Sequence, residues 1–340
     1  MEFLPTVWFI LIAVLWTGYL FLEGFDLGVG MFMKLVARNE QERRLLLNTI
    51  GPVWDGNEVW LITAAGATFA AFPLWYASLF SGLYLPMLLV LLALIFRAVS
   101  IEYRGKINSS SWRARWDWGL SLGSLFAAFG VGMALAITTT GLPLNANGDR
   151  VGGPFSWFSW YAVLGGLAVV GFCLAHAAFF ISLKTDGEMR HRARGFALRL
   201  LPLLLLPLIG WAVAVQLQSG KPAGLALIVV AVAAAAICWA RSRAGREGQA
   251  FAAQAIFLLG VTGSIFSNVY PVVLPSTLDP ANSLTVGSAA ASDYTLGLMS
   301  IVACFGVPLV LAYQSWTYWV FRKRLKIESI PEPHSLPAAV

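Results

Sequence analysis

Long apolar runs constrain the fold of this chain more than any other feature. Only 12% of its 340 residues are charged, against about 25% in soluble domains. A helix needs about 20 mostly apolar residues to cross a bilayer core of about 30 Å. The sequence therefore predicts an all-α polytopic membrane protein, and we place nine spans at residues 6–33, 50–72, 77–99, 119–141, 157–183, 200–218, 222–240, 250–270 and 294–320.

The basic residues between these spans lie almost entirely on one side. The opposite side holds only Arg150 and Lys221, so the positive-inside rule places the N-terminus outside and the C-terminus in the cytoplasm. A net charge of +6 could suggest nucleic-acid binding. Because the basic residues follow the membrane topology instead, we expect no nucleic-acid partner. We expect residues 1–326 to form one transmembrane domain and 327–340 a disordered cytoplasmic tail. The basic side carries Lys34, Arg38, Arg43, Arg44, Arg104, Lys106, Arg113, Arg115, Lys184, Arg190, Arg192, Arg194, Arg199, Arg241, Arg243, Arg246, Arg322, Lys323, Arg324 and Lys326.

The second span contains two acids in the stretch LLNTIGPVWDGNEVWL, residues 46–61. Asp55 and Glu58 are three residues apart, so a helix places them on one face. An Asn-Thr pair at 48–49 offers a cap for this helix, and Pro52 suits its first turn. An acid within a span costs about 2.5–3.5 kcal/mol on insertion scales. Both acids must therefore face protein or water.

The first span repeats this spacing with Glu23 and Asp26. The first two spans run in opposite directions, so all four acids converge near the cytoplasmic side. Arg97, in the third span, is a candidate counter-ion for one of them. The functional interpretation is a proton path, because carboxyl groups in a low-dielectric site hold and release protons near neutral pH. The structural interpretation is a buried ion-pair network that fixes the helix register.

Two other residues within the spans, Trp54 and His176, each allow two interpretations. Trp54, beside the second pair of acids, is either an interface anchor or a contact for a ring such as a quinone. His176 in the fifth span is either an internal helix contact, which we favour, or a haem ligand. A proton-coupled transporter would use the same acids, but it would show inverted repeats and interrupted helices near the midplane. Here the acids lie off-centre and the helices read as continuous.

Two further patterns concern packing. Gly24 and Gly28 form a G-x-x-x-G pair, which lets a neighbouring helix approach closely. Residues 271–293 are apolar for a loop and include three prolines. We expect this segment to be folded at the outer interface.

Several motifs occur in an order that resembles subunit II of the cytochrome bd-type quinol oxidases. They are GFDLGVG, GPVWDGNEVWL, FRAVSIEYR, NVYPVVLPST with NSLTV and AAASDYTL, and YQSWTYWVFRKR, running from about residue 18 to 324. The resemblance implies nine helices arranged as two four-helix bundles and a peripheral helix. It implies a haem-free chain in a prokaryotic cytoplasmic membrane. Its partner would be a larger subunit I with b- and d-type haems, and a small single-helix accessory subunit is a further candidate partner.

The family's activity gives the matching residues expected roles. The two large subunits oxidise quinol and reduce O2 to water with cytoplasmic protons, which is electrogenic without pumping. By resemblance, Asp55 of the W-D-G-N motif belongs to the proton path, and Asp26 matches the aspartate of the G-F-D motif. Trp54 matches a tryptophan near a structural quinone in some members. Some relatives carry Gln where this chain has Glu58.

Overall fold

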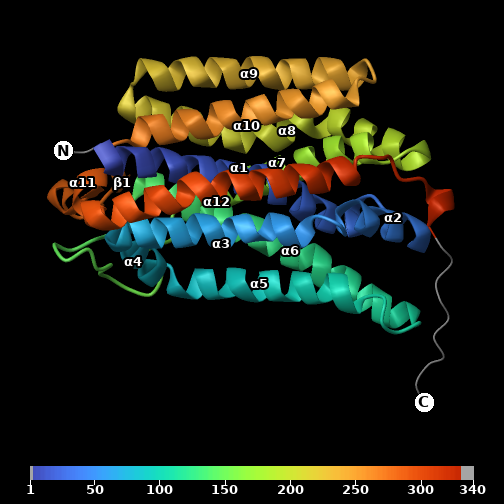
Figure 1. Cartoon of the computed structure of the whole chain (residues 1–340), viewed down its shortest axis with the longest axis horizontal. Helices are drawn as coiled ribbons and strands as arrows, with labels where there is room; N and C mark the ends of the chain where they lie inside the picture. The colour runs from blue at the N-terminus through green and yellow to red at the C-terminus, as the bar shows by residue number, and fades with distance from the viewer. Residues whose placement is uncertain (1–2, 331–340) are drawn as a thin grey trace.

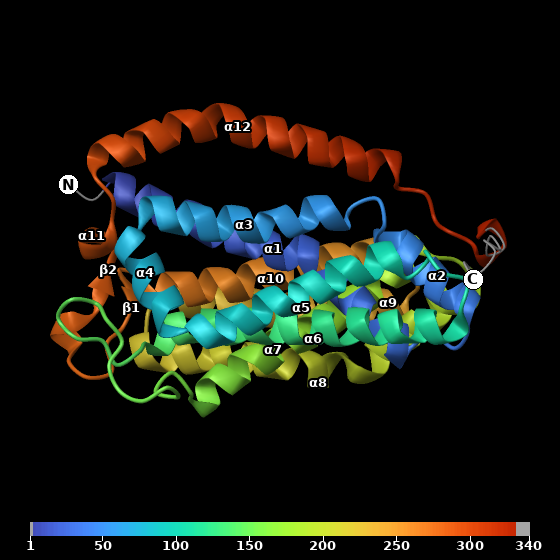
Figure 2. The same cartoon turned by 90° about the horizontal axis from the view of Figure 1, so that it is seen from below.

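The computed structural model describes residues 3–330, in which long helices run side by side along one axis (Figures 1 and 2). The start of α1 and the end of the described chain lie at opposite ends of this bundle. We call the end that carries α2 and the basic loops the inner end. The helices are α1 (Phe3–Leu35), α2 (Glu40–Ile50), α3 (Trp54–Ala71), α4 (Pro73–Gly82), α5 (Tyr84–Tyr103), α6 (Ser110–Thr140), α7 (Trp160–Lys184), α8 (Gly187–Ser219), α9 (Pro222–Arg243), α10 (Glu247–Val269), α11 (Val286–Ala289) and α12 (Asp293–Val320).

Eight of the described helices are long and apolar enough to cross a membrane. Predicted span 50–72 corresponds to α3, which is not among the eight. α3 has 18 residues, and Asp55, Asn57 and Glu58 fall in its first two turns, which lowers its mean hydropathy. α3 nevertheless lies alongside α1 within the bundle (Figure 2). A mostly helical polytopic membrane protein is confirmed, with one small two-stranded sheet at the outer end, whereas the count of nine spans and the grouping into two bundles stay predictions.

The start of α3 differs from the prediction. Its N-cap is Val53, without a side-chain hydrogen bond, and residues 48–49 belong instead to the separate helix α2. Thr49 Oγ1 donates a hydrogen bond to the Leu46 carbonyl within α2. The predicted cap is therefore wrong, because Gly51 and Pro52 form a turn between two helices and do not continue one.

The third predicted span also begins too early. Residues 77–82 belong to α4, and α5 begins only at Tyr84. Pro73 opens α4, and the residue before a proline is driven out of the helical region. Phe72 accordingly has φ −135° and ψ 69°. The chain therefore bends at the outer end before α5 returns to the inner end.

α1 and α7 form the centre of the bundle. In the most apolar window of α7, 83% of the residues are buried. Gly28 of α1 faces α7 so closely that a Cβ there would lie 2.1 Å from the Cys173 carbonyl oxygen. The predicted close approach at Gly24 and Gly28 is therefore confirmed, and it lets α1 carry its acids into the protein interior.

The outer end has its own small core. Strand β1 (Val272–Leu274) pairs antiparallel with β2 (Leu284–Thr285), with the 3-10 turn η1 (Pro280–Asn282) between them. These elements and α11 pack with α4 and the start of α1 around buried Trp8, Phe72 and Trp75. The segment 271–293 is folded, as the sequence predicts.

The described chain ends in the 3-10 turn η2 (Ile327–Ser329), which lies against α2. Just before it, the Leu325 amide donates to the Lys184 carbonyl at 2.8 Å, and the Asp186 amide donates to the Leu325 carbonyl at 3.0 Å. The tail predicted from residue 327 therefore contains a turn at its start. Its remainder, 331–340, lies outside the described residues.

Candidate functional site

Arg97 of α5 connects acids from two other helices inside the bundle. Its Nη2 lies 2.7 Å from Glu23 Oε1 of α1 and its Nη1 lies 2.9 Å from Glu58 Oε2 of α3. The side chains of Arg97 and Glu23 are 0% exposed, and that of Glu58 is 18% exposed. A buried ion pair of this kind must offset the loss of hydration of both partners. The sequence predicted one partner for Arg97, and the structure gives it two.

Asp26 takes a different partner. Its Oδ2 accepts a hydrogen bond from Asn57 Nδ2 at 2.7 Å. Asn57 Oδ1 accepts in turn from Tyr318 Oη at 2.8 Å and from Gln314 Nε2 at 3.1 Å, both on α12. Asn57 is fully buried. The amide thus joins the Asp26 carboxyl group to the helix that otherwise stands away from the bundle (Figure 2).

The cluster has unsatisfied hydrogen-bonding capacity. Within the described chain, both carboxyl oxygens of Glu23, Oδ1 of Asp26, Nε of Arg97 and the Tyr19 hydroxyl are buried without a hydrogen-bond partner. Such atoms in folded proteins are usually bonded to protein groups or ordered water. Three carboxyl groups share one guanidinium here, so charge pairing alone does not balance them. The arrangement can hold protons or water as well as an ion pair.

Asp55 lies apart from the other three acids. Its side chain is exposed and forms no hydrogen bond or ion pair with any described residue. It lies one helical turn before Glu58, close enough for the two charges to interact. Trp54, beside it, is partly buried and packs against the main core. The structure therefore places Asp55 on the exposed surface one helical turn from Glu58, and the quinone contact of Trp54 stays a prediction.

His176 lies inside an aromatic cluster. Its ring stacks between Phe172 and Phe251, with centroids at 5.0 and 4.9 Å, and its Nε2 lies 2.8 Å from the Phe21 carbonyl oxygen. The imidazole is fully buried. These contacts agree with an internal helix contact.

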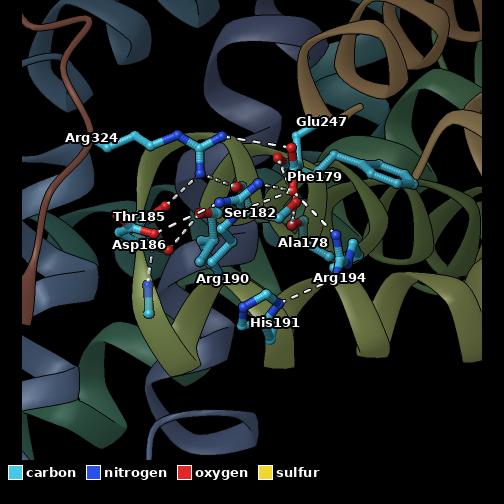
Figure 3. A network of polar contacts seen from close by, with 12 residues as sticks. Ala178, Phe179, Ser182, Thr185, Asp186, Arg190, His191, Arg194, Glu247 and Arg324 are labelled. Atoms are coloured by element: carbon cyan, nitrogen blue, oxygen red, sulfur yellow. Dashed lines mark hydrogen bonds and ion pairs between the residues drawn. The ribbon is translucent and has the colours of Figure 1, made fainter. Parts of the chain in front are cut away.

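The inner end carries a second set of charges, arranged differently. Arg104 Nη2 lies 2.7 Å from Glu40 and its Nε lies 2.5 Å from Asp117. Arg192 lies 2.7 Å from Glu42, and Figure 3 shows Glu247 surrounded by Arg190, Arg194 and Arg324. These contacts link α2, α5, α6, α8, α10 and the segment after α12.

Hydrogen bonds control ionisation in α2. Partial burial by itself raises the pKa of Glu42, but the hydrogen bonds from Arg192 and from the Arg38 amide outweigh it and hold that pKa below its usual value. Burial likewise raises the pKa of Glu40, and the hydrogen bonds and charge of Arg104 lower it further than burial raises it. Both carboxylates are therefore ionised structural partners at neutral pH.

Sequence reasoning missed the polar side chains of this cluster that carry no charge. Asn57, Gln314 and Tyr318 are the bridging residues, and Trp60 Nε1 donates to Gln314 Oε1 at 2.8 Å. Asn57 lies between the two acids of α3, and Gln314 is a polar residue in an apolar helix. A buried amide within a span was the available signal, because such a group needs a partner.

Comparison with known proteins gives one consistent result. The family model for cytochrome bd terminal oxidase subunit II matches residues 4–321. The chain is 40% identical to cytochrome bd ubiquinol oxidase subunit 2 of Bacillus subtilis over 332 residues, covering 96% of this chain and 98% of that protein. It is 33% identical to cytochrome bd-I ubiquinol oxidase subunit 2 of Escherichia coli K12, covering 98% and 99%. The fold resembles the bd oxidase structure from Geobacillus thermodenitrificans, with a TM-score of 0.75 at 20% identity over 94% of this chain and 98% of that one.

Proposed function

Because the chain belongs to the cytochrome bd terminal oxidase subunit II family, we propose that it admits cytoplasmic protons to the oxidase through Asp55, Glu58 and Glu23. Membership makes it a multi-pass protein of the bacterial plasma membrane and a component of a respiratory complex with subunit I. The proton route is our proposal. The observation that carries it is the graded burial of the three acids from the exposed Asp55 to the fully buried Glu23.

Arg97 would organise the buried part of this route. A guanidinium stays protonated at any physiological pH, so it does not relay protons itself. Its contacts of 2.7 and 2.9 Å hold Glu23 and Glu58 on either side of one charge. That charge favours the anionic form of either acid, and a proton can then move between them through hydrogen-bonded water. Glu23 Oε1 already lies 2.7 Å from Arg97 Nη2, so Oε2, which has no hydrogen-bond partner among the described residues, is the group to which such water would bond.

Asp26 would form a side branch of the same route. It lies one turn from Glu23 on α1 and accepts from Asn57. Its Oδ1 has no hydrogen-bond partner in the described residues. A carboxyl group with one tethered and one untethered oxygen can take up a proton without losing its position.

We also propose that the chain supports assembly while the b- and d-type haems reside in subunit I. His176 is stacked between Phe172 and Phe251, and its Nε2 lies 2.8 Å from the Phe21 carbonyl oxygen, so this imidazole is already engaged by protein groups. In the apolar window of α12 only 6% of the residues are buried, so this helix offers a large apolar surface to a partner. A structural quinone beside Trp54 and a single-helix accessory subunit are further partners we expect. The transporter alternative has no support from the family match, which spans nearly the whole chain.

The test compares Asp55→Asn and Glu58→Gln with Glu188→Gln in the purified oxidase. Glu188 is an ideal control because its side chain is 83% exposed at the inner end and pairs with Arg192. We expect Asp55→Asn and Glu58→Gln to lower quinol-driven O2 consumption by about 10²-fold, the lower end of the effect of a positioned proton-transfer group. Haem content and subunit stoichiometry should stay at the wild-type level, as should the activity of Glu188→Gln.

Unchanged turnover in both variants would overturn the proton route. If neutralising every acid of the cluster left turnover intact, the cluster would be a structural scaffold. Loss of haem or of subunit I in Asp55→Asn would assign that residue to assembly instead.

A further inference from the structure

We propose that a pocket at the inner end binds one anionic glycerophospholipid of the cytoplasmic leaflet. The cavity has a volume of about 390 Å³, within the usual range for ligand pockets. It lies between α1, the end of α2 with the turn before α3, α7, α10 and the end of α12. Its wall is largely aromatic, with Phe21, Phe25, Phe180, Phe251 and Phe321 among the lining residues.

The rim of this pocket is cationic. Lys184, Arg322 and Arg324 line it, and no acidic residue within 3–330 does. Lys184 is the last residue of α7 and is half-buried, and among the described residues its ammonium group has no ion-pair or hydrogen-bond partner. A phosphate is the group that such an ammonium would bind.

Arg324 gives the rim a fixed position. Its Nη1 donates to the Thr185 carbonyl at 2.9 Å and to the Ser182 carbonyl at 3.3 Å, and its Nη2 lies 3.6 Å from Glu247 (Figure 3). Glu247 is also contacted by Arg190 and Arg194. Asp186 is a second acid of this network, 3.7 Å from Arg190. The two acids face three arginines, and Lys184 and Arg322 have no ion pair within the described residues, so the rim keeps a positive surplus.

Position and shape together identify the occupant. Basic pockets between helices on the cytoplasmic side suit acidic lipid headgroups, and the inner end is the predicted cytoplasmic side. The aromatic wall requires an apolar body below the charge, which a free phosphate lacks and an acyl chain supplies. A zwitterionic lipid would bring its own cation to a rim that already has three. An anionic glycerophospholipid satisfies both parts of the pocket.

A lipid bound here would contact both α7 and α12 and hold their inner ends together. Lys184 ends α7, while Tyr318 and Arg322 belong to the end of α12 and the turn after it. Tyr318 lines the pocket and also donates to Asn57 of the acid cluster. The lipid would therefore hold the inner end of α12 in the position from which Tyr318 reaches that cluster.

The test uses the whole purified oxidase in nanodiscs that contain a trace of photoreactive phosphatidylglycerol or photoreactive phosphatidylcholine, each with a diazirine in its acyl chain. We expect phosphatidylglycerol to label the peptides around Phe25 and Phe180 about tenfold more than phosphatidylcholine does. The double variant Lys184→Gln/Arg322→Gln should lose this preference. Lys184→Arg should retain it.

The matched control is Arg243→Gln/Lys323→Gln. It removes the same charge from the same end, and Arg243 lies over Trp239 at 5.4 Å much as Arg322 lies over Trp319 at 4.3 Å. Neither control residue lines the pocket, so labelling should stay at the wild-type level. Equal labelling by the two lipids, or equal loss in both double variants, would overturn the proposal. Haem content verifies assembly in each sample. Leu183→Trp narrows the pocket without altering charge and should also lower the labelling.

Discussion

The buried acid cluster and the ion pairs of the inner end are both built from carboxyl groups and arginines. Acids are in excess in the buried cluster, whereas arginines are in excess around Glu247 at the inner end. In the described part of the bundle interior, Glu23, Asp26 and Glu58 lie with a single guanidinium, that of Arg97. At the inner end, Glu247 alone is contacted by three arginines.

This difference in charge balance distinguishes structural ion pairs at the inner end from a candidate proton-binding site in the interior. A carboxylate that accepts hydrogen bonds from cations stays ionised and holds helices together. A buried carboxyl group with unsatisfied oxygens and too few cations must bind protons or water to be stable. We infer that the inner-end pairs fix the helix ends while the interior cluster carries protons.

Replacing one arginine in each region should give the largest difference in stability between the two regions. Arg97→Gln leaves Glu23 buried without a cation, and breaking a buried pair in this way costs about 3–5 kcal/mol. Arg104→Gln leaves Asp117 with Arg43 at 3.6 Å and should cost about 1.5–3 kcal/mol, as expected for hydrogen bonds to charged groups. The yield of haem-containing complex and its thermal stability in detergent measure both effects.

Suppressor variants connect this prediction to the charge balance. Glu23→Gln combined with Arg97→Gln removes the unpaired buried charge and should recover part of the assembled oxidase without recovering turnover. If Arg104→Gln were the more damaging single change, the inner-end pairs would be the more important of the two regions.

The bridge between the acid cluster and α12 gives the next effect in size. Asn57→Ala removes the donor to Asp26 and the acceptor for Tyr318 and Gln314, which should cost about 1–3 kcal/mol for the buried groups left unsatisfied. We expect faster amide exchange at the inner end of α12 and lower turnover. Asn108→Ala removes an exposed hydrogen bond with Arg113 at the inner end and should change neither. Unaltered exchange in Asn57→Ala would mean that α12 is positioned by other contacts.

Sequence alone predicted the membrane class, the acids and the arginine because each depends on local chemistry. Apolar length identifies a span, and an ionised group within it needs a partner. Which helices are central could not be predicted, because α7 and α12 are both apolar enough to span a membrane although 83% and 6% of their apolar windows are buried.

The details missed at α2 and at Asn57 have a related cause. α2 is a short helix within a basic loop, and its N-cap Asn39 accepts from the Glu42 amide. Its two buried leucines, Leu45 and Leu46, lead directly into the apolar run that begins at residue 50, so the sequence does not separate α2 from the next span. The partners of Asn57 on α12 are more than 250 residues away along the chain, and spacing along one helix carries no information about such contacts.

Acid should affect the inner-end pairs in a way that tests their structural role, with the smallest effect of the three. The pKa of Glu42 is held below its usual value, so its contribution to stability is complete above the unfolded pKa of about 4.3 and is lost as the pH falls through the lower folded pKa. Glu42→Gln should lower the thermal stability of the oxidase at pH 7 by the equivalent of about 0.2–1 kcal/mol. The difference between the variant and the wild type should shrink as the pH falls below the unfolded pKa of about 4.3 and vanish below the folded pKa of Glu42. A difference that persisted undiminished in acid would mean that Glu42 acts through packing and that its pairing with Arg192 does not stabilise the oxidase.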